Sequence, residues 1–279
     1  MATNIIVARG GVEYVPPISL AFWRWLFVFL ILFPFFYSEI YKKRIFLKKE
    51  FYKLFFLGLM GCGVCGAFPF IAGMSTTMAN MGIIYTSSPV FIIILSVFLF
   101  SEKIILNRII GLIICLIGVI TIITKANISY LVDFKFTSGD FWMLGAAIGW
   151  ALYSIYLLNW KSRFSLMGRF TLIAFFGFIS LFPFYMIEEA LIFDTKFNSI
   201  FFAWVLFAAI SPGIIAFTLY TKVQRYLGAS LTGFTLYLFA VYGAIFGIIL
   251  FEEMLLPFHY FGGALFFAGV YIARKIKTV

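Results

Sequence analysis

The sequence predicts an all-α protein, a polytopic membrane bundle of about ten helices built from two inverted five-helix repeats. Composition, the spacing of apolar runs and an internal repeat support this prediction. Hydrophobic residues make up 64% of the 279 residues and charged residues only 11%. A water-soluble domain could not cover so much apolar surface with so few charges. A lipid bilayer solvates an apolar exterior, so the composition indicates a membrane protein.

The apolar runs have the length of membrane spans. A helix needs roughly 20 apolar residues to cross the hydrocarbon core of a bilayer. Runs of about that length follow one another with short connections, which leave no room for a separate soluble domain. The predicted spans are Pro17–Tyr37, Leu54–Met74, Ala79–Phe100, Arg108–Thr124, Phe141–Leu158, Phe170–Ile187, Ile200–Tyr220, Leu227–Phe251 and Phe258–Ala273.

The two halves of the chain align without gaps when the sequence is shifted by 151 residues, which places Gly111 on Gly262 and Gly118 on Gly269. A fixed offset of this kind indicates an internal duplication. We predict one repeat over residues 1–125 and a second over 139–276. Further matched pairs are Gly82 with Gly233, Glu102 with Glu253, Val90 with Val241 and Phe56 with Phe207.

The same shift accounts for the short apolar start, Met1–Ala8, which is too short to cross and lacks the pattern of a signal peptide. The span Phe141–Leu158 aligns with positions that run from before residue 1 to Val7. Met1–Ala8 therefore corresponds to the end of a first helix, so nine of the expected helices are complete here. We interpret the short start as a late start codon or a truncated gene, with a functional nine-helix variant as the alternative.

The basic residues indicate the orientation, because Lys and Arg accumulate in cytoplasmic loops. Placing the Lys-rich segment Tyr41–Lys53 inside and alternating the spans puts most other basic residues inside, including the C-terminal ones. The inside set also contains Lys103, Arg108, Lys161, Arg163, Arg169, Lys222, Arg225, Arg274, Lys275 and Lys277. The outside set is Arg9, Lys125, Lys135 and Lys196 with most of the acids, Glu13, Asp133, Asp140, Glu188, Glu189, Asp194, Glu252 and Glu253.

This distribution explains the net charge of +10 as a topology signal rather than a nucleic-acid surface. Because each repeat has an odd number of helices, the two copies must enter the membrane from opposite sides. We therefore predict inverted repeats in a cell inner membrane, with the C-terminus in the cytoplasm. Inverted repeats are common in carriers, because each half can adopt the conformation of the other.

Several segments resemble the EamA-type members of the drug/metabolite transporter superfamily. The first-half segments are Ala8-Arg9, Pro16–Trp25, Ser87–Phe91, Phe100–Lys103, Gly111 and Gly118; the second-half segments are Tyr237–Val241, Phe251–Glu253, Gly262 and Gly269. The resemblance covers essentially the whole chain. It implies ten helices, cytoplasmic termini, a cavity between the halves and export of amino acids or other metabolites. The chain departs from the pattern in its shortened first helix and in Ala240, where the family has a proline.

Arg24 is the charged residue that lies well inside a predicted span, roughly 10 Å from the outer end of its helix. A charge at that depth is costly unless it is paired, hydrated or able to reach the interface. One interpretation is that Arg24 meets a carboxylate or phosphate of a substrate. The other is a structural arginine that snorkels between Trp23 and Trp25 or bonds helix-end carbonyls.

Polar and aromatic residues in the middle of spans are further candidates for substrate binding. They are Thr86, Ser87, Ser88, Trp150, Tyr153 and Tyr237. Pro89 frees a backbone carbonyl beside the first three. Each alone is better explained by packing, but as a set they predict a weakly polar, aromatic-lined cavity for a small organic solute. Ser211-Pro212-Gly213 is a candidate hinge.

The sequence offers no catalytic residues, no metal ligands and no cofactor motif. Its single histidine, His259, lies at a span boundary, and Cys62 and Cys65 lack partner ligands. The spans contain no mid-membrane carboxylate, which favours facilitated movement or exchange over proton coupling.

We therefore predict a non-enzymatic inner-membrane transporter that exports or exchanges amino acids or similar small metabolites by alternating access. Its partners are a small-molecule metabolite and the lipid bilayer, with no nucleic acid and no feature that sets an oligomeric state. The alternatives are a transport-inactive structural or assembly subunit and a membrane-embedded lipid enzyme.

Overall fold

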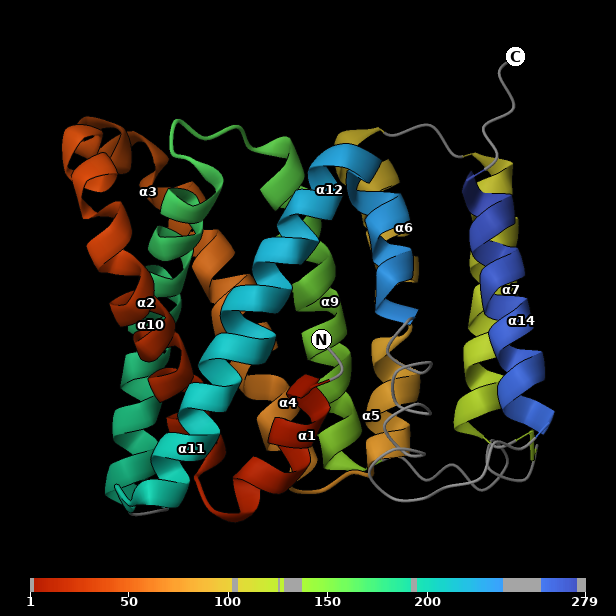
Figure 1. Ribbon diagram of the computed structural model, residues 1–279, viewed down its shortest axis with the longest axis horizontal. Coiled ribbons are helices and arrows are strands. Elements are labelled where there is room, and N and C mark those ends of the chain that lie inside the picture. The colour runs from red at the N-terminus through yellow and green to blue at the C-terminus, as the bar shows by residue number, and fades with distance from the viewer. Residues whose placement is uncertain are drawn as a thin grey trace.

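The computed structural model describes residues 3–101, 105–124, 126–127, 137–191, 195–237 and 257–274, and every regular element in this part of the chain is helical. Figure 1 shows the helices standing side by side as a bundle. Among the described residues, five helical stretches are long and apolar enough to cross a membrane: Pro17–Lys42, Arg44–Gly73, Ser138–Asn159, Leu166–Leu191 and Ser199–Tyr237. The all-α membrane bundle predicted from the sequence is confirmed.

The first half of the chain forms the helices that run from α1 to α7. Their bounds are α1 Thr3–Gly10, η1 Gly11–Glu13, α2 Pro17–Lys42, α3 Arg44–Gly58, η2 Leu59–Val64, α4 Cys65–Gly73, α5 Met78–Tyr85, α6 Ser88–Phe100 and α7 Leu106–Ile123. The second half comprises α9 Ser138–Asn159, α10 Leu166–Leu191, α11 Ser199–Ala208, η3 Ala209–Ile215, α12 Ala216–Gly233, η4 Phe234–Tyr237 and α14 Pro257–Arg274.

Two predicted boundaries were wrong. The Lys-rich segment Tyr41–Lys53 is not a loop, because α2 continues to Lys42 and α3 begins at Arg44, leaving a corner at Lys43. The Lys43 ammonium stabilises this corner by bonding Glu39 Oε1 at 2.8 Å and the carbonyl of Arg163 at 2.7 Å. The predicted span Ala79–Phe100 is divided into α5 and α6, because Pro89 at the start of α6 cannot donate a backbone bond to the preceding turn.

The chain reverses direction within α12. Gly228 has φ 79° and ψ 171°, a conformation that a side chain would strain, and it separates the helix into two parts. Figure 1 shows α12 rising to the upper end of the bundle and the chain then descending beside α6. This reversal confirms that the predicted spans Ile200–Tyr220 and Leu227–Phe251 are separate where the structure describes them.

Matching π-helical segments interrupt the third helix of each half. The segment η2 covers Leu59–Val64, and η3 covers Ala209–Ile215, which lies 151 residues later within one position. In η3 the proline Pro212 removes a backbone donor, and in η2 the glycines Gly61 and Gly63 allow neighbours to approach closely. π-helical turns are rare and occur often at functional sites.

The helices α7 and α14 pack against each other through the glycines that defined the repeat. A Cβ on Gly111 would lie 2.4 Å from the carbonyl oxygen of Gly269, and one on Gly118 would lie 2.6 Å from that of Gly262. The contacts are reciprocal, since Gly111 is equivalent to Gly262 and Gly118 to Gly269. Between them, the Cys115 thiol donates to the carbonyl of Phe266, its own equivalent, at 3.3 Å. An inverted duplication predicts this twofold-related crossing of antiparallel helices.

The equivalent helices α2 and α10 are also antiparallel, and each caps the other's first turn. The Glu188 carboxylate, near the end of α10, accepts the backbone N–H groups of Ile18 at 3.0 Å and Ser19 at 2.6 Å. At the opposite end, the Glu39 carboxylate accepts the backbone N–H and the hydroxyl of Ser165, each at 2.6 Å. A carboxylate at a helix N-terminus satisfies free N–H groups and complements the helix dipole.

The bundle has a basic end, which carries Lys42, Lys43, Arg44, Lys161, Arg163, Arg169, Lys222 and Arg225. This end is uppermost in Figure 1, where α2 meets α3 and α9 leads into α10. Some residues used above lie outside the described part of the chain. They are Met1, Glu102, Lys103, Lys125, Asp133, Lys135, Asp194, residues 238–256, Lys275 and Lys277, together with the side chains of Arg9, His259 and Arg274.

Candidate functional site

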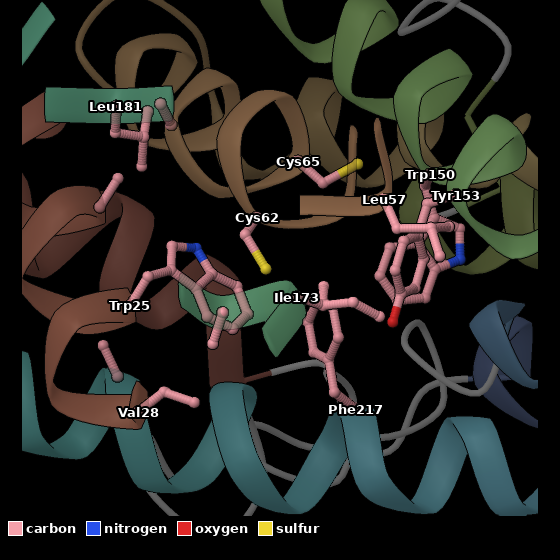
Figure 2. Close-up of a cluster of buried hydrophobic side chains, with 14 of the residues drawn as sticks. Trp25, Val28, Leu57, Cys62, Cys65, Trp150, Tyr153, Ile173, Leu181 and Phe217 are labelled. Atoms are coloured by element: carbon pink, nitrogen blue, oxygen red, sulfur yellow. The ribbon is translucent and has the colours of Figure 1, made fainter. Parts of the chain in front are cut away.

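Aromatic rings from four helices meet in the core of the bundle. The ring of Phe217, on α12, has its centroid 5.0 Å from that of Trp25, 5.2 Å from Trp150, 5.6 Å from Tyr153 and 5.5 Å from Phe170. Figure 2 shows Phe217 between Trp25 on one side and the Trp150–Tyr153 pair on the other. We call these five residues the aromatic layer.

Arg24 lies against the aromatic layer and is 2% exposed. Its guanidinium carbon stacks 4.6 Å from the ring centroid of Trp25 and 4.9 Å from that of Phe70, and Nη1 donates to Asn4 Oδ1 at 2.7 Å. Arg24 therefore does not snorkel. It is held inside the bundle by two aromatic faces and by an amide from α1, and its Nε has no hydrogen-bond partner within the described part of the chain.

A buried polar network joins α9 to α12 next to Trp150, whose ring centroid lies 4.8 Å from that of Tyr220. The hydroxyls of Ser154 and Tyr220 are 2.7 Å apart. Gln224 Nε2 lies 2.7 Å from both the carbonyl oxygen and the hydroxyl of Ser154. A buried network of this kind rigidifies the helix pair when its members are satisfied.

A cavity of about 310 Å³ opens beside this network at the basic end of the bundle. Its inner wall includes Tyr153 and Phe170 of the aromatic layer. The cavity lies among α9, α10, α12 and the α9–α10 connection. Its lining residues are Tyr153, Leu157, Leu158, Trp160, Lys161, Ser162, Leu166, Arg169, Phe170, Ile173, Thr221, Gln224 and Arg225.

The structure brings some predicted site residues together. Trp150 and Tyr153 are both buried, with ring centroids 5.4 Å apart, and Tyr153 lines the cavity. Arg24 reaches the same aromatic layer through Trp25. These three residues therefore share one neighbourhood around the aromatic layer.

The other predicted site residues lie elsewhere. The hydroxyls of Ser87 and Ser88 donate to the carbonyls of Ile84 at 2.6 Å and Tyr85 at 2.7 Å, and buried Thr86 completes the turn between α5 and α6. Tyr237, which is equivalent to Thr86 in the repeat, is buried in a separate cluster with Cys115 and Phe266. Their role in binding stays a prediction.

Several residues at the cavity had a different meaning in the sequence. Lys161, Arg169 and Arg225 were predicted only as orientation signals, and neither Gln224 at the cavity nor Phe217 in the aromatic layer was predicted as a site residue. Arg169 carried a usable signal, since it lies at the start of a long apolar run that its side chain must either leave or line.

The fold and the cavity define a polytopic membrane protein of the transporter class. The chain belongs to the EamA-like transporter family, whose model matches residues 1–124 and 137–274.

Curated relatives and a solved structure agree with this assignment. The chain is 26% identical over 198 residues to the "Uncharacterized transporter YetK" of Bacillus subtilis, covering 71% of this chain and 60% of the relative. It is 25% identical over 230 residues to an "Uncharacterized transporter" of Methanothermobacter thermautotrophicus, covering 81% of this chain and 65% of that relative. The chain thus spans less than two thirds of these relatives. A crystal structure that shares 16% sequence identity superposes on this chain with a TM-score of 0.73. The match covers 98% of this chain and 93% of the other chain, which supports the fold.

Proposed function

We propose that this membrane transporter exports or exchanges amino acids or similar small metabolites by alternating access. In this proposal the segments 1–125 and 139–276 are the two repeats that exchange conformations. The basic end and the C-terminus face the cytoplasm of an inner membrane. The chain itself is not an enzyme, and its partners are a small solute and the bilayer.

The observation that carries the proposal is a cavity that opens at one end of the bundle and stops at a layer of side chains. A carrier in one of its two access states has a solute pathway that is open to one side and closed to the other. We assign the closed part to the aromatic layer, since Tyr153 and Phe170 line the cavity and both pack against Phe217. The cavity volume of about 310 Å³ is within the usual range of small-molecule sites.

In this proposal the equivalent π-helical segments η2 and η3 are the places where the helices bend. Phe217 follows η3 by two residues, and Tyr153 packs against Gly61 of η2, where a Cβ would lie 2.4 Å from the Tyr153 ring. A change in either segment would therefore move a ring of the aromatic layer. Because η2 and η3 are equivalent in the two repeats, an exchange of their conformations would open the solute pathway to the opposite side of the membrane.

The test is uptake of labelled amino acids and organic acids into liposomes that contain the purified full chain. We expect saturable uptake that excess unlabelled solute inhibits. Pro212→Ala restores a backbone donor in η3, and we expect it to slow uptake by about ten-fold, or about 1.4 kcal/mol in the barrier.

Pro183→Ala is the matched control, because Pro183 lies inside the uninterrupted helix α10. It should leave the uptake rate within about two-fold of the wild type. Uptake that rises linearly with every solute, or an equal effect of the two substitutions, would contradict the proposal and favour a structural subunit.

A further inference from the structure

The cavity at the basic end has an unbalanced charge. Three of its lining side chains are cationic, Lys161, Arg169 and Arg225, and none of the lining residues is acidic. Lys161 and Arg225 are exposed at the mouth, whereas Arg169 is 7% exposed. Cations that converge on a partly dehydrated cavity attract an anion, because the low dielectric strengthens their field.

Arg169 is only partly satisfied by the protein. It lies in the first turn of α10, where its Nη1 donates to the carbonyl of Leu157 at 2.9 Å. Its Nε is buried and has no hydrogen-bond partner among the described residues. A guanidinium offers five N–H donors in a planar fork that suits carboxylate and phosphate oxygens. A buried, partly unpaired guanidinium that lines a cavity is therefore a receptor for an oxyanion.

The neighbouring acid does not neutralise the cavity. Glu50 is not among the residues that line the cavity. The oxygens of Glu50 are engaged with the α9–α10 connection, where Oε1 accepts the backbone N–H of Arg163 at 3.0 Å and Oε2 accepts the Ser162 hydroxyl at 2.6 Å. Glu50 thus orders the connection that carries Lys161, and the cavity keeps its excess of positive charge.

We propose that this cavity binds a small organic oxyanion, a carboxylate or a phosphate ester, with Arg169 as its main ligand. Lys161 and Arg225 attract the anion at the mouth. The apolar walls formed by Leu157, Phe170 and Ile173 hold its carbon skeleton. This assignment rests on the proposed transport function and narrows its substrate to solutes that carry an anionic oxygen group.

The experiment measures binding to the full chain in lipid nanodiscs by isothermal titration calorimetry. The probes are two pairs that differ mainly in charge: succinate with succinamide, and glycerol 3-phosphate with glycerol. We expect saturable binding of at least one anion below about 10 mM and affinity for its uncharged counterpart at least about ten-fold weaker. Comparing the two anions distinguishes a carboxylate site from a phosphate site.

Substitutions then assign the binding to the cavity. Arg169→Gln should weaken binding of the anion by about ten-fold or more, and Arg169→Lys by less, because a single ammonium keeps the charge but not the fork. Arg163→Gln is the matched control, since Arg163 is exposed in the same connection, outside the cavity lining, and its guanidinium carbon lies 5.7 Å from the ring centroid of Phe46. It should change the affinity by less than about two-fold.

If Arg169→Gln does not fold, the doubly substituted Lys161→Gln, Arg225→Gln protein decides the question, because both side chains are exposed. It should lower the affinity by about five-fold or more. Three results would overturn the inference. They are equal affinity for an anion and its uncharged counterpart, no saturable binding of either anion, and an equal loss of affinity in the cavity variants and in Arg163→Gln.

The two proposals fail in different ways. Anion binding that depends on Arg169, combined with no flux in liposomes, supports the binding site and refutes transport. Saturable flux of uncharged or cationic solutes that is unaffected by Arg169→Gln supports transport and refutes the anion site.

Discussion

The contact between α7 and α14 allows a quantitative prediction with an internal control. A Cβ on Gly262 would lie 2.6 Å from the carbonyl oxygen of Gly118 and 2.5 Å from Cγ1 of Ile122. At the next residue, Gly263, no atom of the described residues lies within 4 Å of the position that a Cβ would take. Gly262→Ala therefore forces the two helices apart, whereas Gly263→Ala does not.

The expected cost follows from the size of this overlap. Non-bonded carbon atoms prefer separations of about 3.5 to 4.0 Å, so the helices must separate by about 1 Å. The carbonyl belongs to helix backbone and cannot rotate away. Overpacking of this kind costs about 1–3 kcal/mol, and we place Gly262→Ala near 2–3 kcal/mol. Its repeat equivalent, Gly111→Ala, should cost a similar amount.

Cys115 reports the opening of this contact directly. It is buried between the helices, so a maleimide reaches its thiol only when they separate. Labelling in lipid nanodiscs, located by mass spectrometry, should be about 30- to 150-fold faster in Gly262→Ala, because each 1.4 kcal/mol corresponds to a factor of ten. Gly263→Ala should label at the wild-type rate. Wild-type labelling of Gly262→Ala, or equal acceleration in both variants, would refute the packing argument.

Three further predictions concern the core and the end of α10. Phe217→Ala removes the central ring of the aromatic layer and should raise the leak of preloaded solute from liposomes. The control Phe207→Ala, at a 40% exposed position, should leave the leak unchanged. Equal leaks from the two variants would contradict a barrier role for the aromatic layer. Asn4→Leu removes the hydrogen-bond acceptor of Arg24 and should lower the free energy of unfolding in SDS titrations by about 1–3 kcal/mol. Asn4→Asp should raise that free energy instead. An unchanged free energy of unfolding in Asn4→Leu would show that the hydrogen bond is dispensable. Glu188→Gln weakens the cap on α2 and should cost about 1 kcal/mol in the same titration, so an unchanged midpoint would argue against the cap.

Much of the fold was predictable because its causes are local or repeated. The apolar runs reflect the thickness of the bilayer, which fixes the length of each span. The matched glycines Gly111, Gly118, Gly262 and Gly269 revealed the duplication because close backbone contact excludes any side chain. The break at Thr86–Ser87 lies inside a run predicted as one span, and Pro89, which frees a backbone carbonyl there, is the sequence signal for it.

The candidate site was predictable only in part. Arg24, Trp150 and Tyr153 stood out because a polar or aromatic group inside a span requires an explanation. Tyr237 met the same criterion but packs beside α7 and α14 instead. The sequence gives a residue's depth in the membrane more reliably than the partner that its side chain faces.

The sequence by itself determined the membrane class, the duplication and the clustering of basic residues at one end. These properties depend on composition and on spacing along single helices. Only the tertiary structure decided that Arg169 and Arg225 share a cavity with Tyr153, and that Tyr153 and Trp25 both pack against the ring of Phe217. The physical reason is that helix period fixes which residues share a face, whereas packing between distant helices decides which faces meet.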